Sequence, residues 1–339
     1  MADRAEPVTA WRVHELGDPA DVLRLERVSP PAPGPGQLGI EVTACALNFA
    51  DALLCRGTYQ DKPPLPFTPG LEVCGVVSAV GRGAAEQAPA DDLLGRRVIA
   101  LPALPHGGLA ERAVAAVTDV FTIPDTMDDI TAAALPVTYQ TGWFGLYHRA
   151  ALAPGETVLV HAGAGGVGSA AIQLARARGA RVIATAGGAD KVARCLELGA
   201  ERAIDYRSED FVEATKAFTD GRGADVIYDS VGGDTFDGSR RCVAFEGRIV
   251  VVGFAGGRIA EAPTNHLLVK NYSVVGLHWG LYRTRRTDLV RACHEELVRL
   301  HQEGAIAPLI GEVRPLAEAA AALTDLAGRA TVGKVVLVP

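Results

Sequence analysis

The residues whose types and spacing best suit chemistry form a glycine-rich loop with the pattern G-x-G-x-x-G, and they are Gly163, Gly165, Gly166, Val167 and Gly168. An apolar, β-branched run at 158–160 precedes the loop, and a helical segment and a second apolar run at 182–184 follow it. A tight turn out of a parallel strand needs a positive φ, and a pyrophosphate approaches the backbone where no Cβ intrudes. The next helix offers free N–H groups to the anion. Strand, loop, helix and strand together predict a dinucleotide-binding site.

The end of the second strand indicates which dinucleotide the loop would bind. In NAD sites an acidic residue at this point accepts hydrogen bonds from the ribose hydroxyls, whereas residues 185–188 read Thr-Ala-Gly-Gly. Asp190 stands slightly later, where it is better suited to cap the helix that it opens. Lys191 lies in the first turn of that helix, and Tyr206 and Arg207 follow the third strand. A missing acid and a cation near its place favour NADPH over NADH as the cofactor.

Several segments resemble the medium-chain dehydrogenase/reductase superfamily, and more narrowly its zinc-free quinone oxidoreductase, or zeta-crystallin-like, branch. The matching segments run in the expected order over nearly the whole chain and are 46–59 (ALNFADALLCRGTY), 69–77 (PGLEVCGVV), 161–168 (HAGAGGVG), 228–236 (YDSVGGDTF) and 271–280 (NYSVVGLHWG). The resemblance implies a Rossmann doubly wound parallel sheet joined to a GroES-like, β-rich catalytic domain.

The zinc alcohol dehydrogenases of that superfamily differ from this chain at the metal. Their catalytic zinc is held by a Cys three residues before an Asp and by a His in a G-H-E sequence. Here those positions hold Asn48, three before Asp51, and Leu71 between Gly70 and Glu72. Neither an amide nor a leucine is a zinc ligand of the usual kind, which leaves Glu72 as a lone carboxylate. We therefore predict no catalytic metal, and an acceptor that takes a hydride without a Lewis acid.

Quinones and small α,β-unsaturated carbonyls meet that requirement, because hydride addition places charge on an oxygen that needs only a hydrogen-bond donor and a proton. The resemblance implies that Tyr59 lies near the nicotinamide, where its phenol would donate to that oxygen. It gives Asn48 a similar role as a substrate-orienting amide. A second tyrosine of some bacterial quinone reductases is Leu53 here, so that version of the quinone pocket is absent.

The resemblance also assigns residues to the cofactor. Thr141, in the helix before the Rossmann strand, corresponds to a threonine near the nicotinamide. Gly253 and Phe254 follow an apolar strand where backbone groups meet the carboxamide. Asn271 and Arg329 correspond to positions near the adenosine phosphate end or the domain cleft, and Arg329 is the better match.

Two rival functions remain open. An enoyl-thioester reductase acting on acyl-CoA would need a basic entrance for the phosphoadenosine, for which Arg283, Arg285 and Arg286 are candidates. A protein of another class would bind NADPH with little turnover, because zeta-crystallin-like chains also serve as structural or RNA-binding proteins. The acidic net charge argues against RNA, and the intact glycine motif together with Tyr59 favours catalysis.

Composition excludes several classes of partner. The 339 residues carry a net charge of −7 with acids and bases interspersed, so nucleic acid and anionic membranes are poor partners. The N-terminus carries Asp3 and Glu6 and has no apolar core of a signal peptide, and no later run suits a membrane span. We predict a cytoplasmic protein. Six scattered cysteines without a C-x-x-C pair predict buried, reduced thiols, and they are Cys45, Cys55, Cys74, Cys195, Cys242 and Cys293.

The elements that must position these residues fall into two groups. Residues 1–135 predict a β-rich, partly barrel-like domain of short strands separated by Pro and Gly, at 9–13, 23–28, 38–45, 73–80, 97–100, 110–114 and 120–123. The resemblance implies that this is the GroES-like catalytic domain. Residues 136–278 predict the Rossmann domain. A helical stretch at 128–152 leads into it, and its six parallel strands are predicted at 158–160, 182–184, 203–205, 226–229, 249–252 and 273–275. Its later helices are predicted at 190–198, 208–218 and 234–244.

The C-terminal tail predicts a helix at 287–301, a helix at 316–327 and a closing strand at 332–338. The pattern leaves open whether the tail completes the first domain or extends the second, and we assign 279–339 to the first. Relatives are commonly dimers joined through an edge strand of the nucleotide domain. The resemblance therefore implies a homodimer, with 272–277 as the edge.

Overall fold

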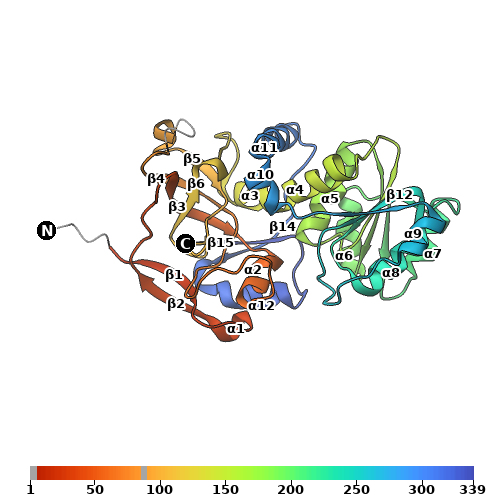
Figure 1. The fold of residues 1–339 in the computed structure, drawn as a ribbon, viewed down its shortest axis with the longest axis horizontal. Coiled ribbons are helices and arrows are strands. Elements are labelled where there is room, and N and C mark those ends of the chain that lie inside the picture. Colours follow the sequence, from red (N-terminus) through yellow and green to blue (C-terminus); the bar gives the residue numbers. More distant parts are fainter. Residues whose placement is uncertain (1–5, 85–89) are drawn as a thin grey trace. The chain divides into compact units, whose positions relative to one another are not determined.

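The computed structural model describes residues 6–84 and 90–339, so Asp3 lies outside the described residues. Contacts divide the chain into two compact units, drawn in Figure 1. Unit 1 joins Met1–Val137 to Ile310–Pro339, and unit 2 is Thr138–Leu309. The assignment of residues 279–309 to the first domain is wrong, because these residues pack in unit 2.

Polar side chains explain where that segment packs. The indole of Trp143 donates to Oε2 of Glu296 at 2.8 Å, within helix α11 (Thr287–Gln302). Gln173 then pairs with the backbone of Ala307, accepting from its N–H at 2.7 Å and donating to its carbonyl at 2.9 Å. These bonds join residues far apart in sequence, so no local pattern reveals them.

Unit 1 is built on strands. The antiparallel pair β1 (Val8–Val13) and β2 (Leu23–Val28) stands apart from a larger sheet. That sheet contains β3 (Gln37–Ala46), β4 (Val73–Val80), β5 (Arg97–Ala100), β6 (Arg112–Ala116), β7 (Val120–Thr122), β14 (Ile310–Pro315) and β15 (Lys334–Val338). Among the described residues its order is β14-β15-β3-β4-β5-β7, with β6 also paired to β3. The predicted β-rich domain is confirmed, with strand ends shifted by one or two residues.

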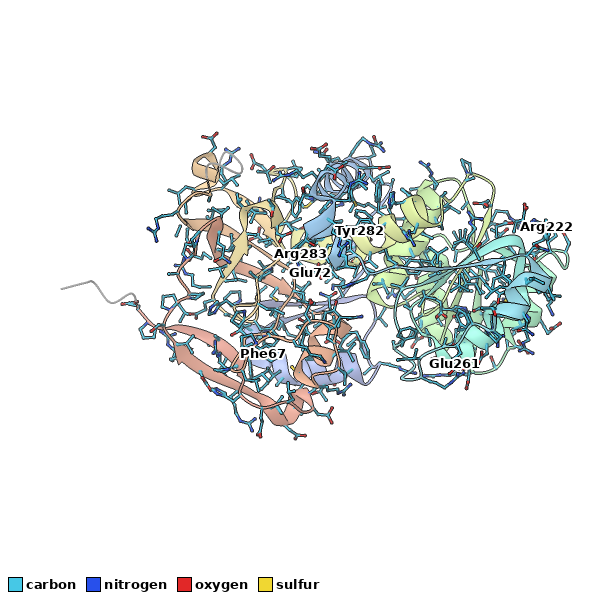
Figure 2. All side chains as sticks on the ribbon, in the orientation of Figure 1. Phe67, Glu72, Arg222, Glu261, Tyr282 and Arg283 are labelled. Atoms are coloured by element: carbon cyan, nitrogen blue, oxygen red, sulfur yellow. The ribbon has the colours of Figure 1, made fainter. Side chains whose placement is uncertain are left out.

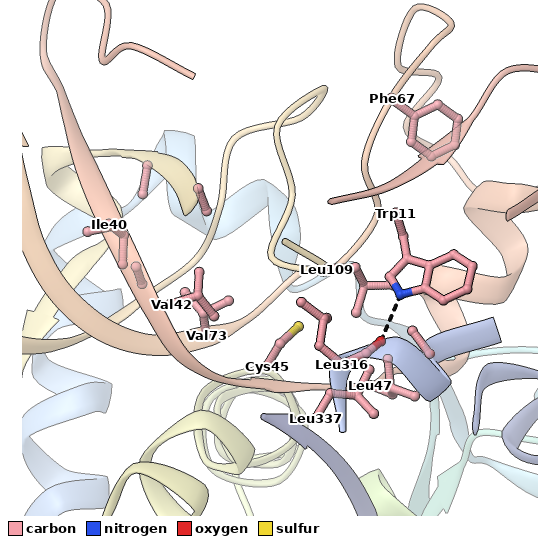
Figure 3. Packing of buried hydrophobic residues seen from close by; sticks show 14 of the residues in the cluster. Trp11, Ile40, Val42, Cys45, Leu47, Phe67, Val73, Leu109, Leu316 and Leu337 are labelled. Carbon is pink, nitrogen blue, oxygen red and sulfur yellow. Dashed lines mark hydrogen bonds between the residues drawn. The ribbon is translucent and has the colours of Figure 1, made fainter. Parts of the chain in front are cut away.

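The last strand of the chain finds its sheet in unit 1. β15 pairs antiparallel with β3, placing Val336 opposite Ala46, and parallel with β14. A third link is the Trp11 indole, which donates to the carbonyl of Leu316 at 2.7 Å inside the apolar core (Figure 3). β14 was not predicted, because its sequence IGEVRP contains a glycine, ends in proline and carries polar residues. The position of the C-terminal tail is therefore determined by the pairing of β15 with β3 and β14, and not by its local sequence pattern.

Two helices of unit 1 were also missed, α1 (Pro19–Val22) and α2 (Phe49–Cys55). α2 begins at Asn48, whose backbone N–H donates to Oδ2 of Asp51 at 2.8 Å in a capping box. The available signal was the N-x-x-D spacing at the start of the apolar run. The surrounding proline and glycine clusters outweighed it in the sequence.

The predicted single helix at 128–152 is three elements. They are α3 (Asp129–Ala134), α4 (Pro136–Trp143) and the π-helix η3 (Phe144–Arg149). Pro136 lacks an N–H and its ring clashes with the carbonyl four residues earlier, so one helix cannot run through it. Thr141 consequently lies on α4, which is shorter than predicted.

Unit 2 contains a parallel sheet with helices on both faces (Figure 1). The strands are β8 (Thr157–Val160), β9 (Arg181–Ala186), β10 (Arg202–Asp205), β11 (Ala224–Asp229), β12 (Val243–Val251) and β13 (Ser273–Gly276). Within the described part of the chain the order is β10-β9-β8-β11-β12-β13, with all neighbours parallel. The six predicted strands and the doubly wound fold are confirmed. The direction of winding changes between β8 and β11, which places ligands at their carboxyl ends.

The helices of unit 2 are α5 (Gly166–Ala177), α6 (Ala189–Glu197), α7 (Phe211–Phe218), α8 (Gly233–Cys242), α9 (Thr264–Lys270), α10 (Gly280–Arg285) and α11. α7 starts later than predicted because the Asp210 side chain caps it, accepting from Val212 N–H at 2.8 Å. α8 ends earlier than predicted because β12 begins at Val243. Within the described residues no helix is both long and apolar enough to cross a bilayer. All six cysteines lie in the described residues and are buried and free, as predicted.

A buried histidine ties the glycine loop to the sheet. His161 follows β8 and is 1% exposed. The Ser239 hydroxyl donates to the Thr235 carbonyl at 2.8 Å, so it accepts from Nε2–H of His161 at 2.9 Å. Nδ1 of His161 then accepts from the Thr185 hydroxyl at 3.1 Å. Burial lowers the pKa of His161, and the nearby Asp229 only partly opposes this effect. The imidazole is therefore neutral in the folded protein.

This network makes stability depend on pH. Below a pH of about 6.5, His161 binds a proton in the unfolded chain but not in the folded chain. The free energy of unfolding therefore decreases as pH falls. We expect the denaturation midpoint of the wild type to drop more than that of His161→Gln between about pH 7.5 and about pH 5.5. Urea denaturation followed by fluorescence measures this. His14→Gln, which changes an exposed histidine, is the control and should keep the pH dependence of the wild type. An equal change of the midpoint with pH in the wild type and in His161→Gln would contradict a neutral His161.

Candidate active site

The glycine loop is shaped by close contacts and not by positive φ. A Cβ at Gly168 would lie 2.2 Å from the Ala162 carbonyl oxygen, and one at Gly163 would lie 2.8 Å from Sγ of Cys195. A Cβ at Gly165 would meet only the Ala162 oxygen, at 3.3 Å. The residue with positive φ in this turn is Ala162, at 52°. The expectation that a motif glycine supplies the positive φ is therefore wrong.

The glycines of the loop have two different roles, and together these roles leave room for a ligand. Two of them let β8, α5 and α6 approach one another, and Gly165 keeps the N-terminus of α5 open. Gly165, Gly166 and Val167 are partly exposed, and the first N–H groups of a helix have no acceptor within it. A pyrophosphate fits here because the amides and the helix dipole favour an anion, and no side chain stands at Gly165.

A basic cluster surrounds the carboxyl end of β9. A Cβ at Gly187 would lie 2.5 Å from the Tyr206 hydroxyl and 3.1 Å from Nε of Arg207, so both side chains rest against this glycine. The pKa of Lys191 is lowered by burial first and then by the positive charge of Arg207. Tyr206 and Arg207 therefore lie against Gly187, and Lys191, in the first turn of α6, is close enough to Arg207 for the two charges to interact.

Two carboxylates, Asp205 and Asp190, lie near this cluster, and Asp205 binds backbone N–H groups. Asp205 accepts from the backbone N–H of Gly188 at 3.0 Å and of Arg207 at 3.1 Å, and these bonds lower its pKa. Asp190 was predicted to cap α6, but the cap is Gly188 and the helix starts at Ala189. Asp190 instead lies in the first turn of α6, where a negative side chain interacts favourably with the helix dipole. Arg207 was noted only as following the third strand, and the turn after β10 brings it to Gly187.

The carboxyl ends of β11 and β12 form the other side of the switch point. Oδ1 of Asp229 accepts from the N–H groups of Val231 and Gly232, at 2.8 and 2.9 Å. Gly253 follows β12, and a Cβ there would meet only the Ser230 carbonyl at 3.5 Å. The Phe254 ring packs against Gly232, where a Cβ would lie 2.7 Å from it. This edge is open to a ligand at Gly253, while Thr141 on α4 is 8% exposed.

Two more of the predicted residues, Tyr59 and Arg329, belong to unit 1. Tyr59 is partly buried and packs against the apolar core of that unit, two residues after Gly57. Its backbone N–H donates to the Leu53 carbonyl at 3.3 Å, which ties it to the end of α2. Arg329 follows α12 (Ala319–Ala327) with a φ of 61°. Asn271, in unit 2, has a left-handed φ of 50° and ends α9, which is a structural reason for an asparagine.

Asn48 lies in a buried polar network that the sequence did not predict. Its Nδ2 donates to Oε1 of Glu72 at 2.8 Å, and its Oδ1 accepts from Nζ of Lys334 at 2.9 Å. Nζ of Lys334 also donates to Oε1 of Glu72 at 2.7 Å. Glu72, labelled in Figure 2, is therefore not the lone carboxylate that the sequence indicated. An ammonium lies beside the two positions, Asn48 and Leu71, at which zinc enzymes carry ligands.

Asp51 is the other buried acid of this region. Its carboxylate accepts from the backbone N–H groups of Asn48 and Gly70, at 2.8 and 2.9 Å. Burial raises its pKa to about 7, although both hydrogen bonds and the charge of Lys334 oppose the rise. Within residues 6–84 and 90–339, no three His, Cys, Asp or Glu side chains gather in a way that could hold a metal ion.

Comparison with known proteins places this geometry in a family. Residues 34–125 match the family model described as an alcohol dehydrogenase GroES-like domain, and residues 166–295 match the one described as a zinc-binding dehydrogenase. Quinone oxidoreductase-like protein 2 of Bos taurus is 41% identical over 93% of this chain and 88% of its own. The chain belongs to the quinone oxidoreductase family of the medium-chain dehydrogenases/reductases.

Solved structures of this quinone oxidoreductase family agree with the fold. The Escherichia coli quinone oxidoreductase complexed with NADPH is 32% identical, with a TM-score of 0.87, covering 98% of this chain and all of its own. A mycobacterial protein complexed with NADPH is 33% identical, with a TM-score of 0.90 over the same shares. The human synaptic vesicle membrane protein VAT-1 homolog is 36% identical over 94% of this chain and 82% of its own. Family membership therefore spans proteins with different names.

The basic cluster yields a test of cofactor choice. Lys191→Ala or Arg207→Ala should each weaken NADPH binding by about tenfold to a hundredfold, because a charge-assisted phosphate contact contributes on the order of 1.5 to 3 kcal/mol. NADH binding should stay nearly unchanged, since NADH carries no 2′-phosphate. Fluorescence titration with both nucleotides measures the effect.

Arg194→Ala is the matched control for this test, because Arg194 lies on the same helix and pairs with Glu197 at the surface. It should leave both affinities unaltered. Equal losses for NADPH and NADH in the Lys191 and Arg207 variants would refute a 2′-phosphate site.

Proposed function

We propose that this chain is an NADPH-dependent reductase of quinones or small α,β-unsaturated carbonyls that works without zinc. The observation that carries the proposal is the packing of Tyr206 and Arg207 against Gly187, with Lys191 interacting with Arg207, together with the accessible N-terminus of α5 at Gly165. Two solved relatives whose structures contain NADPH support the same choice of cofactor. The nearby Asp205 carboxylate is held by the backbone N–H groups of Gly188 and Arg207, at 3.0 and 3.1 Å.

The nature of the acceptor follows from unit 1. Zinc would lower the energy of an alkoxide, but Asn48 and Leu71 occupy its ligand positions, so alcohol oxidation lacks its usual electrophile. A quinone or enone is already activated. When bound, NADPH supplies the hydride, and the protein has to orient the acceptor, exclude water and donate to the oxygen on which charge collects.

We assign the donor role to Tyr59, with Asn48 as a second polar group. A neutral phenol donates a hydrogen bond at neutral pH because its ordinary pKa is about 10. Tyr59 packs on the core of unit 1 and is tied to α2, so its ring is held at one end of a short helix that begins at Asn48. Both groups therefore depend on the placement of α2.

The acyl-CoA alternative rests on Arg283, Arg285 and Arg286. Arg286 forms a two-bond ion pair with Asp288, at 3.0 and 2.8 Å, so it is engaged already. Arg283, labelled with Tyr282 in Figure 2, lies on the same helix, α10. The ion pair of Arg286 with Asp288 favours a quinone or enone over a thioester that carries a phosphoadenosine group.

An acceptor panel tests the proposed function. We expect NADPH oxidation with 1,2-naphthoquinone and with small enones to exceed that with crotonyl-CoA in steady-state assays. A clear preference for crotonyl-CoA would replace the quinone reductase with an enoyl-thioester reductase. NADPH binding without oxidation by any acceptor would favour the binding protein of low turnover.

Tyr59→Phe tests the donor role. Removing the phenol hydrogen should lower kcat with the quinone by about tenfold to a hundredfold, while NADPH affinity changes little, because the lost bond strengthens only as charge develops. Stopped-flow NADPH oxidation measures the rate. Tyr206→Phe should show the opposite pattern, with weaker NADPH binding and a smaller change in kcat. Unchanged turnover in Tyr59→Phe would make this tyrosine a structural residue.

We further propose a homodimer joined at β13. Within the described residues β13 pairs only with β12, so its other edge offers free backbone groups. Phe245 on β12, and Leu268 and Val269 on α9, are 70%, 76% and 73% exposed. Light scattering should give about twice the 35.4 kDa chain mass, and Leu268→Glu with Val269→Glu should shift it to one. A wild-type mass of one chain would contradict this proposal.

A further inference from the structure

Lys334 is an almost fully buried lysine. Its side chain is 3% exposed, and that of its partner Glu72 is 0% exposed. Nζ donates to three acceptors, namely the Leu47 carbonyl at 2.7 Å, Oδ1 of Asn48 at 2.9 Å and Oε1 of Glu72 at 2.7 Å. An ammonium has three N–H groups, so every donor is satisfied. A buried charge persists when it is paired and hydrogen-bonded in this way.

The topology of unit 1 explains how these residues meet. β3 runs antiparallel to both β4 and β15, so its carboxyl end lies beside the amino ends of its two neighbours. Asn48 follows β3, Glu72 immediately precedes β4 and Lys334 opens β15. Glu72 is held further by Val137 N–H, which donates to Oε2 at 2.7 Å. Four segments of chain therefore converge on one ion pair.

The network also controls the side chain of Asn48. Because Lys334 donates to Oδ1, the amide is fixed with Nδ2 toward Glu72. The other acceptor for Nδ2 is the Ala46 carbonyl at 3.4 Å, which is a long contact. One N–H of Asn48 is therefore the donor for which a substrate oxygen would compete. The same residue caps α2, which leads to Tyr59.

We propose that Lys334 is a positioning residue for the reduction, whose buried ammonium holds the Asn48 amide and the start of α2, and through them Tyr59, in the orientation that the acceptor needs. The inference rests on the proposed function. It adds a residue that acts through Asn48. A positive charge at this place also polarises the Asn48 amide, which strengthens its N–H as a donor.

Asp51 provides a readout of the same charge. It accepts from Asn48 N–H, and its pKa of about 7 is raised by burial and by Glu72 and lowered by the two backbone bonds and Lys334. Loss of the ammonium removes one lowering influence, so the pKa of Asp51 should rise. A pH profile that depends on Asp51 would then move to higher pH.

The first experiment compares Lys334→Met with Lys334→Arg and with Lys216→Met, a surface control on α7 whose lysine pairs with Glu213. We expect Lys334→Met to lower kcat with 1,2-naphthoquinone by about tenfold or more, with NADPH affinity within about twofold of the wild type. The pH profile of kcat should shift upward. Lys334→Arg should recover part of the rate. Wild-type kcat and pH profile in Lys334→Met would overturn the proposal.

A second variant separates positioning from folding. Removing one partner of a buried ion pair is strongly destabilising, whereas removing both is often close to neutral. Lys334→Met with Glu72→Gln should therefore regain thermal stability but keep a low kcat. If kcat returns together with stability, Lys334 is only structural and the proposal fails. This comparison holds even where Lys334→Met alone does not fold.

Chemical rescue provides a readout that does not depend on turnover. Ethylammonium should raise the thermal midpoint of Lys334→Ala and restore part of its kcat, whereas tetramethylammonium, which has no N–H, should do neither. Failure of ethylammonium to raise the midpoint would overturn the ammonium site. A wild-type protein that binds NADPH and reduces no acceptor would overturn the proposed function instead, and the midpoint shift still tests the site.

Discussion

The buried contact between the Lys334 ammonium and the Glu72 carboxylate is the constraint on which unit 1 depends. It joins residues 262 positions apart and links the start of the last strand, β15, to the start of β4 on the two sides of β3. Once both charges are out of water, each needs all its partners, because an unpaired buried charge is costly. Asn48, Leu47 and Val137 supply them. The start of α2 is thereby fixed, and the residues assigned to the acceptor depend on it.

Unit 2 follows a different constraint, that of parallel strands. Their carboxyl ends meet at one edge, so residues from separate segments collect there without direct pairing. The glycines after β8, the basic side chains after β9 and β10, and Gly253 after β12 share that edge. Close contacts with side chains at Gly163 and with the backbone at Gly168 keep the edge compact, and Gly165 keeps it accessible. The proposed anion site thus depends on the arrangement of the strands as much as on any one residue.

The cations of the two units differ in their surroundings. In unit 2, Lys191 and Arg207 are the cations that we propose for the 2′-phosphate. In unit 1, the one lysine of the network is neutralised internally by Glu72 and is held by neutral acceptors. The cations of unit 2 are typical of a site that binds an anion, whereas the Lys334–Glu72 pair is typical of a structural ion pair that needs no further anion. The proposed metal-free reduction relies on both.

The sequence by itself determined the doubly wound unit, the glycine loop and the zinc-ligand replacements, because strand periodicity, glycine spacing and residue type are local properties. Only the tertiary structure decided that Ala162 carries the positive φ, that Arg207 rests on Gly187, that α10 and α11 pack in unit 2, and that Lys334 pairs with Glu72. Each of these depends on contacts between residues distant in the chain, or on sterics that emerge only once neighbouring strands and helices are packed. A pattern read along one segment carries no information about such a partner.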